Sequence, residues 1–164
     1  MTSKLLYLPI IILFLSLLSC STEEVSGNGN LNIDLNEVPA PKIIEIEVME
    51  RINQYRIERG LNSLGSLDII RALAYEHTTY MIRVNDVNHD NFYQRKQILE
   101  QRANAVIVSE NVAYGYNSAE SVVNAWLNSE GHRENIEGNY TDFDISAEQD
   151  ENGKWYFTNI FIKR

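Results

Sequence analysis

The chain has 164 residues, of which 44% are hydrophobic and 10% aromatic, enough for the core of one domain and too many for general disorder. Its 23 acidic and 14 basic residues give a net charge of -9, and we expect no nucleic-acid partner because binding phosphates requires a basic surface. The single cysteine excludes an intramolecular disulfide and a zinc site built from cysteines.

Residues 1–19 have the pattern of an export signal. Lys4 precedes an apolar run from Leu5 to Leu18, and a run of this length is too short for an ordinary membrane-spanning helix, which needs about 20 residues. The run ends at Cys20 in the stretch LLSC, which resembles the lipobox of bacterial lipoproteins. The resemblance implies cleavage before Cys20, lipidation of its thiol and attachment to a membrane. The alternative is an ordinary secretory signal with an incidental cysteine.

Residues 20–41 are expected to form a flexible tether that carries the lipidated Cys20. They are mostly polar and include glycine, asparagine and two prolines. The stretch STEE at 21–24 resembles surface-export signals of Bacteroidetes lipoproteins, although a solvated tether explains it equally well. The expected location is the cell envelope outside the cytoplasm, at an outer membrane or the cell surface.

Residues 42–164 are expected to form one domain whose first half is helical. Apolar stripes at helical spacing predict helices over residues 41–60 and 67–84. A shorter helix with polar exposed positions is predicted over 92–102. The brief apolar run at 105–108 predicts a buried strand.

The second half of the domain ends in strands. A helix is predicted from Ser118, its N-cap, to Gly131. Apolar and polar residues then alternate over 143–147, a turn is predicted at 150–153, and β-branched and aromatic residues predict a strand over 154–163. Helices followed by an antiparallel hairpin indicate an α+β domain.

The histidines are the first candidates for chemistry. His89, Glu110 and His132 each lie at the end of a predicted element, where side chains can converge. Two imidazoles and a carboxylate can hold a divalent metal or move protons near neutral pH. From spacing alone, surface or capping histidines explain the pattern better than a shared site does. His77 lies on an apolar helix face and is interpreted as a hydrogen-bonded histidine at the edge of the core, and Ser109 lacks the setting of a catalytic nucleophile.

From about residue 43 to the end, the chain resembles the CAP superfamily (cysteine-rich secretory, antigen-five and pathogenesis-related proteins), and most closely its bacterial branch without disulfides. The resemblance rests on motifs in the family's order. They are INQYR with GL and L at 52–64, A-x-x-H-T-x-x-M at 74–81, NH with F at 88–92, ENVAYG at 110–115, WLNSEGHRENI at 126–136 and WYFTNIF at 155–161.

The resemblance implies a three-layer α-β-α sandwich with a C-terminal antiparallel hairpin and a cleft. In many members of the family the cleft holds two histidines and two glutamates. Position by position, the histidines fall on His89 and His132, and one glutamate falls on Glu110, with Asn111 beside it. The other glutamate has no firm match, and Glu100 is the candidate. In the family, the histidine pair can bind zinc or a similar divalent cation.

The chain departs from the family motifs at several positions. Ser109 replaces the glycine before Glu-Asn, and Glu130 replaces a proline. Residues 142–146 lack the family's I-G-V-G, so Asp144 and Ser146 stand where backbone usually runs close. We therefore expect the floor of the cleft to differ from that of the family, and we expect the fold to be the same.

Three functions remain open. The leading one is an extracytoplasmic lipoprotein that is not an enzyme and that binds a lipid or a cell-wall-associated protein, with a divalent-metal site in its cleft. The second is a metal-dependent hydrolase of peptides or nucleic acids, in which zinc on His89 and His132 activates water and Glu110 is either the catalytic base or a further ligand. The third is a structural surface lipoprotein whose histidines only brace loops.

Overall fold

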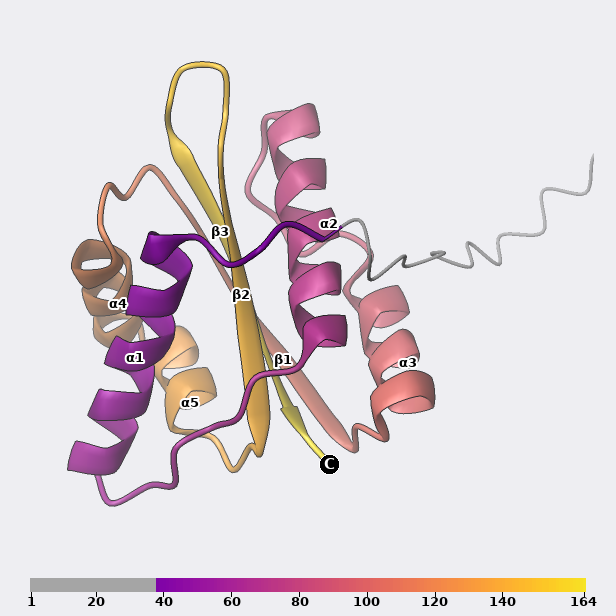
Figure 1. Ribbon diagram of the computed structural model, residues 1–164, viewed down its shortest axis with the longest axis vertical. Coiled ribbons are helices and arrows are strands. Elements are labelled where there is room, and N and C mark those ends of the chain that lie inside the picture. The colour runs from indigo at the N-terminus through magenta and orange to yellow at the C-terminus, as the bar shows by residue number, and fades with distance from the viewer. Residues whose placement is uncertain (1–37) are drawn as a thin grey trace, which may run out of the picture.

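The structure is a computed structural model that describes residues 38–164. A sheet lies between two groups of helices, so the domain has three layers (Figure 1). This is the expected α+β sandwich. The predicted signal at 1–19, Cys20 and the tether as far as residue 37 lie outside the described residues.

The described part of the chain contains five helices and three strands. In chain order they are α1 (Ile43–Glu58), α2 (Asp68–Val84), α3 (Phe92–Ala103), β1 (Ile107–Tyr114), α4 (Ala119–Asn128), α5 (Glu130–Glu137), β2 (Asp142–Gln149) and β3 (Trp155–Lys163). The first three helices lie where the sequence predicts them. The strand expected at 105–108 begins later and runs to Tyr114. The sequence did not predict α5, because only one of its residues, Ile136, is buried and it shows no apolar stripe.

The sheet has the order β1-β3-β2, and both pairings are antiparallel. The hairpin between β2 and β3 confirms the predicted turn. Asp150 accepts hydrogen bonds from the amides of Asn152 and Lys154, both at 2.9 Å, and Gly153 takes a φ of +75°, which glycine adopts without strain. In this order β3, the last strand in the chain, lies at the centre of the sheet and pairs with both β1 and β2.

Both faces of β2 are buried, although its sequence alternates between apolar and polar residues. Phe143 and Ile145 face α1 and α4, while Asp144 and Ser146 lie on the face that α2 covers. The alternation alone predicts one solvated face. The second helical layer closes that face instead, so the polar residues of β2 must find partners inside the protein.

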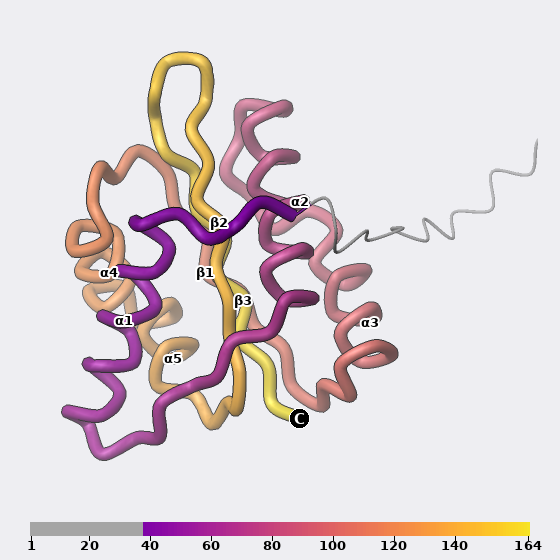
Figure 2. The backbone as a smooth tube through the Cα atoms, in the orientation of Figure 1, coloured from indigo at the N-terminus to yellow at the C-terminus, as the bar shows by residue number. Residues whose placement is uncertain are grey.

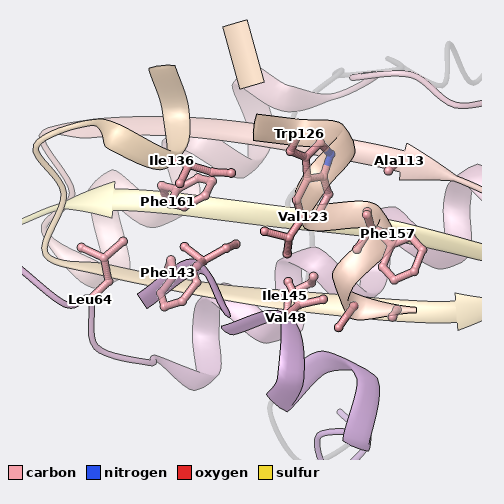
Figure 3. Close-up of a cluster of buried hydrophobic side chains, with 14 residues drawn as sticks. Val48, Leu64, Ala113, Val123, Trp126, Ile136, Phe143, Ile145, Phe157 and Phe161 are labelled. Atoms are coloured by element: carbon pink, nitrogen blue, oxygen red, sulfur yellow. The ribbon is translucent and has the colours of Figure 1, made fainter. Parts of the chain in front are cut away.

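The larger core lies between the sheet and the layer formed by α1, α4 and α5 (Figure 3). Trp126 of α4 is 1% exposed, and its indole nitrogen donates to the carbonyl of Val112 in β1 at 3.2 Å. Its ring meets Phe157 of β3 edge to face, with the centroids 6.4 Å apart. A buried tryptophan with a satisfied N–H thus fixes α4 against the middle of the sheet.

A second core fills the space between the sheet and α2 and α3. Its fully buried members include Ile70, Leu73, Leu99, Ile160 and Ile162. Helices cover both faces of the sheet, and each face carries a buried apolar core. Residues 38–164 therefore have the hydrophobic core that a domain needs to fold on its own. Residues 38–164 contain no cysteine, so packing alone holds this core together.

The chain crosses the outer edge of β2 on its way from α1 to α2 (Figure 2). Gly65 forms a bridge with Asp142 there, and the amide of Phe143 donates to the carbonyl of Gly65 at 2.9 Å. At the other end of β2, Glu45 of α1 accepts from the amide of Ala147 at 2.7 Å. The free edge of the strand is therefore closed by the protein itself.

Across residues 38–164, no helix combines the length and the apolar character required to cross a bilayer.

Candidate functional site

β1 carries two of the predicted site residues, Glu110 and Asn111, in its middle. Both are buried, with Glu110 6% exposed. The sequence analysis placed Glu110 at the end of an element, and that placement is wrong. The apolar run ends at Val108, but β1 continues past Glu110 to Tyr114, so the carboxylate projects from the middle of a strand.

Both oxygens of the Glu110 carboxylate accept hydrogen bonds from side chains. Its Oε2 accepts from Nε of Arg95 at 2.8 Å, and its Oε1 accepts from Nη2 of Arg95 at 2.8 Å, which makes a two-pronged ion pair. The same Oε1 accepts from Nδ1 of His89 at 2.8 Å. Nε2 of His77 lies 3.8 Å from this oxygen. These four residues, His77, His89, Arg95 and Glu110, are the Glu110 cluster.

Arg95 was not recognised from the sequence. It lies on α3 and is 2% exposed, and its Nη1 also donates to the carbonyl of Asp90 at 2.7 Å. The helix looks polar, which indicates a solvated face. The available signal is its spacing to Leu99, four residues on, because the two share the only buried face of α3.

The loop between α2 and α3 presents His89. It begins at Asn85 and ends at Asn91, which have φ values of 52° and 59° in the left-handed region that asparagine tolerates. Nε2 of His77 donates to the carbonyl of Asn88 at 2.9 Å and so ties this loop to α2. The buried position of His77 confirms its interpretation as a hydrogen-bonded residue at the core edge.

His132 lies in the first turn of α5, which two asparagines fasten to β1. Asn111 donates to the carbonyl of His132 at 3.0 Å, and Asn135 donates to the side-chain oxygen of Asn111 at 2.8 Å. Asn135 also reaches the carbonyl of Glu110 at 3.3 Å. His132 is therefore fixed beside the strand that carries Glu110. Glu100 is exposed on α3, lies 3.7 Å from Lys96 and is not part of the Glu110 cluster.

The environment shifts the titration of these groups. Burial raises the pKa of Glu110, but the hydrogen bond from His89 and the charge of Arg95 outweigh it, and the net pKa lies below the usual value. Burial, and then the charge of Arg95, lower the pKa of His77. Burial, and then the charge of His89, lower the pKa of His132. The ionised carboxylate of Glu110 and the neutral forms of His77 and His132 are therefore favoured near neutral pH.

Glu110 and the two cleft histidines differ in their ability to bind a metal. Within residues 38–164, no three His, Cys, Asp or Glu side chains are placed to hold one metal ion, so His89, Glu110 and His132 do not form a three-ligand site. Because Glu110 accepts the Nδ1 proton of His89, the Nε2 atom of His89 remains the one able to bind a metal. A carboxylate that orients a histidine in this way is a common second layer of metal sites.

The comparisons with known proteins establish the family. A model of the cysteine-rich secretory protein family, CAP, matches residues 49–161, and the chain belongs to this family. The match covers most of the described domain and includes Glu110 and both predicted cleft histidines. The resemblance noted from the motifs is thereby confirmed.

Solved bacterial structures share the fold. An outer surface protein from Borrelia burgdorferi superposes with a TM-score of 0.67 at 23% identity, over 76% of this chain and 96% of that one. An extracellular SCP-domain protein from Bacillus anthracis gives a TM-score of 0.63 at 23% identity, over 73% of this chain and 40% of that one.

A curated relative is a membrane protein of unknown function. It is the uncharacterized membrane protein YlbC of Bacillus subtilis, 29% identical over 124 residues, which are 73% of this chain. The chain spans only 34% of the length of that relative. The similarity is therefore between domains, not between whole proteins.

Proposed function

We propose that this protein is an extracytoplasmic CAP-domain lipoprotein, anchored to a membrane through lipid on Cys20, that acts as a non-enzymatic binding module of the cell envelope. The relatives support an exported protein, since they include an outer surface protein and an extracellular one. The ligand classes that we propose are a lipid and a cell-wall-associated protein. A divalent cation, zinc first, is proposed for the histidine pair.

The observation that carries the proposal is the buried, ion-paired carboxylate of Glu110. A general base needs a free lone pair and a pKa near the working pH. Both oxygens of Glu110 already accept charged or imidazole donors, and its pKa lies below the usual value. Glu110, the candidate base of the hydrolase, instead serves as a structural hydrogen-bond acceptor. This favours a binding function over hydrolysis.

The proposed metal ligands are His89 and His132, with solvent or the bound partner completing the coordination. Burial favours the neutral, metal-binding form of His132, and Glu110 leaves Nε2 of His89 free. Arg95 already compensates the charge of Glu110. Two neutral imidazoles on a divalent ion leave its charge uncompensated, so the site favours an anionic group on the ligand.

The test is a calorimetric titration of Zn²⁺ into the chain from Ser21 onward. We expect one site in the wild type, lost in His89→Ala and in His132→Ala, and retained in Glu100→Gln, the matched control on α3. Uptake that is unchanged in both histidine variants means that the pair does not bind the metal.

A second arm tests for catalysis. The zinc-loaded chain is assayed against peptides and nucleic acids, and we expect no turnover. Hydrolysis that Glu110→Gln abolishes would overturn the binding-module proposal in favour of the hydrolase.

One observation favours the purely structural alternative. His77 and His89 both hold the loop at residues 85–91, through Asn88 and Glu110 respectively. If His89→Ala lowers the stability of the chain and no zinc is taken up at all, bracing is the role of the histidines.

A further inference from the structure

A hollow of about 540 Å³ lies between α1 and the start of α2, away from the Glu110 cluster. One wall is apolar and comes from α1, with Ile46, Met49 and Ile57. Ile46 and Ile57 are 45% and 56% exposed, so large apolar side chains are left facing the solvent here. The volume falls in the range of small-ligand sites.

The floor of the hollow is a buried carboxylate. Asp144 of β2 lines the hollow, yet the residue is 2% exposed. Its oxygens accept from the hydroxyl of Ser66 at 2.6 Å and from the amide of Ile145 at 2.9 Å. Both donors are neutral. In the described part of the chain, no lysine, arginine or histidine nitrogen lies within ion-pair distance of Asp144.

A buried carboxylate without a cation is costly and calls for a reason. Burial raises the pKa of Asp144, and the hydrogen bond from Ser66 and the more distant charge of Arg71 offset this only in part. An entering cation would supply the missing partner.

The charges around the hollow favour a cation over an anion. Glu50 lies on its α1 wall, exposed and without an ion pair among the described residues. Arg71 also lines the hollow. Its Nη2 donates to Asp68 at 2.7 Å, whereas its buried Nε has no hydrogen-bond partner among the described residues, so the charge of Arg71 is only partly compensated. Two carboxylates without ion pairs therefore face one arginine that has one.

We propose that this hollow binds an alkylammonium group, with the ammonium on Asp144 and its aliphatic chain along Ile46, Met49 and Ile57. Glu50 at the rim adds a second negative charge. A lysine side chain of a partner protein and a free amine share this chemistry. The site is separate from the histidine pair and does not depend on it.

The test uses hexylammonium as the probe and the chain from Ser21 onward, followed by amide NMR. We expect saturable shifts of the amides of Met49 and Ile145. In Asp144→Asn, whose amide can still bond Ser66, the affinity should fall about tenfold or more. Glu47→Gln, an equal charge change at an exposed position of α1 outside the lining, should stay within about twofold.

Two further probes carry the same chain without the positive charge. Hexanol and hexanoate should bind at least about tenfold more weakly than hexylammonium. Equal binding of hexanol, or stronger binding of hexanoate, overturns the proposal, because the hollow would then be merely apolar or Arg71 would be the anchor. An unchanged affinity in Asp144→Asn overturns it as well.

A pH series on the wild type keeps the test decisive if the variant does not fold. Hexylammonium stays charged, so its binding should weaken as the pH falls through the pKa of Asp144, while binding of hexanol should not change. The other groups facing Asp144 are Glu45 and Glu50 of α1 and Arg71 of α2. Glu50→Gln should retain the pH dependence, and a dependence lost in that variant contradicts the role of Asp144.

A last pair of probes separates the two sources of the amine. A lysine-containing peptide that binds more tightly than hexylammonium, and loses binding when its lysine is acetylated, assigns the site to a partner's lysine. Tighter binding of the free amine assigns it to a small molecule.

Discussion

Arg95 determines what Glu110 can do. A free glutamate beside two histidines is a candidate base or metal ligand, and the sequence supports that interpretation. The structure adds a buried guanidinium that binds both carboxylate oxygens. No local sequence motif predicts the ion pair, because Arg95 and Glu110 lie 15 residues apart on different elements. The family motifs singled out His89 and Glu110 as candidates. They did not predict that Glu110 pairs with Arg95 and accepts a hydrogen bond from His89.

Removing Arg95 should leave a buried charge unpaired. For Arg95→Met we expect a loss of about 3–5 kcal/mol in the free energy of unfolding, measured by urea denaturation. Adding Glu110→Gln should recover part of the loss. Arg102→Met, on the exposed side of the same helix, should cost little. A mild effect of Arg95→Met would show that the ion pair is not a main support of the site.

His77 predicts a pH dependence of stability. Burial lowers its pKa in the folded state, so below about pH 6.5 the unfolded chain binds a proton that the folded chain does not. Stability should therefore fall as the pH drops from about 6.5 towards the folded pKa. In His77→Gln, whose amide can still donate to Asn88, the decline between about pH 7.5 and 5.5 should be shallower. Equal slopes for the two proteins would refute this assignment.

At the scale of elements, apolar spacing predicted most of the fold. The stripes of α1 and α2 and the hairpin turn at Asp150 lie where expected. Two elements escaped. β1 continues beyond the apolar run at 105–108 and ends at Tyr114, because β3 pairs with it along its whole length. α5 buries only Ile136, so side-chain bonds to β1 hold it where an apolar face is lacking.

Arg56 supports the same region through the backbone. Buried in α1, it donates to the carbonyls of Asn62, Ile136 and Gly138 at 2.9, 2.6 and 2.9 Å. Lysine has no fork to reach three acceptors. We expect Arg56→Lys to cost about 2 kcal/mol in thermal or urea unfolding, and Arg59→Lys, exposed on the same helix, to cost much less. Similar values for the two variants would contradict a role for Arg56 in joining α1 to α5.

At the scale of the whole molecule, the domain and its proposed anchor are separate parts. The fold and the histidine pair belong to residues 38–164, whereas the proposed attachment would depend on Cys20. Two acyl chains anchor a protein stably, because each buried CH₂ contributes roughly 0.8 kcal/mol.

The anchor is tested by labelling cells with radioactive palmitate. The wild-type chain should carry the label and sediment with membranes. Cys20→Ser should lose the label, whereas Ser21→Ala, its direct neighbour, should keep it. Label retained in Cys20→Ser would show that the chain is not a lipoprotein of the expected kind.

The most direct test of the central claim is a crystal structure of the zinc-loaded chain, with the metal located by anomalous scattering at the zinc edge. We predict zinc on Nε2 of His89 and on His132, with both oxygens of Glu110 still bound to Arg95. Zinc on the carboxylate of Glu110, or Glu110 released from Arg95, would contradict it.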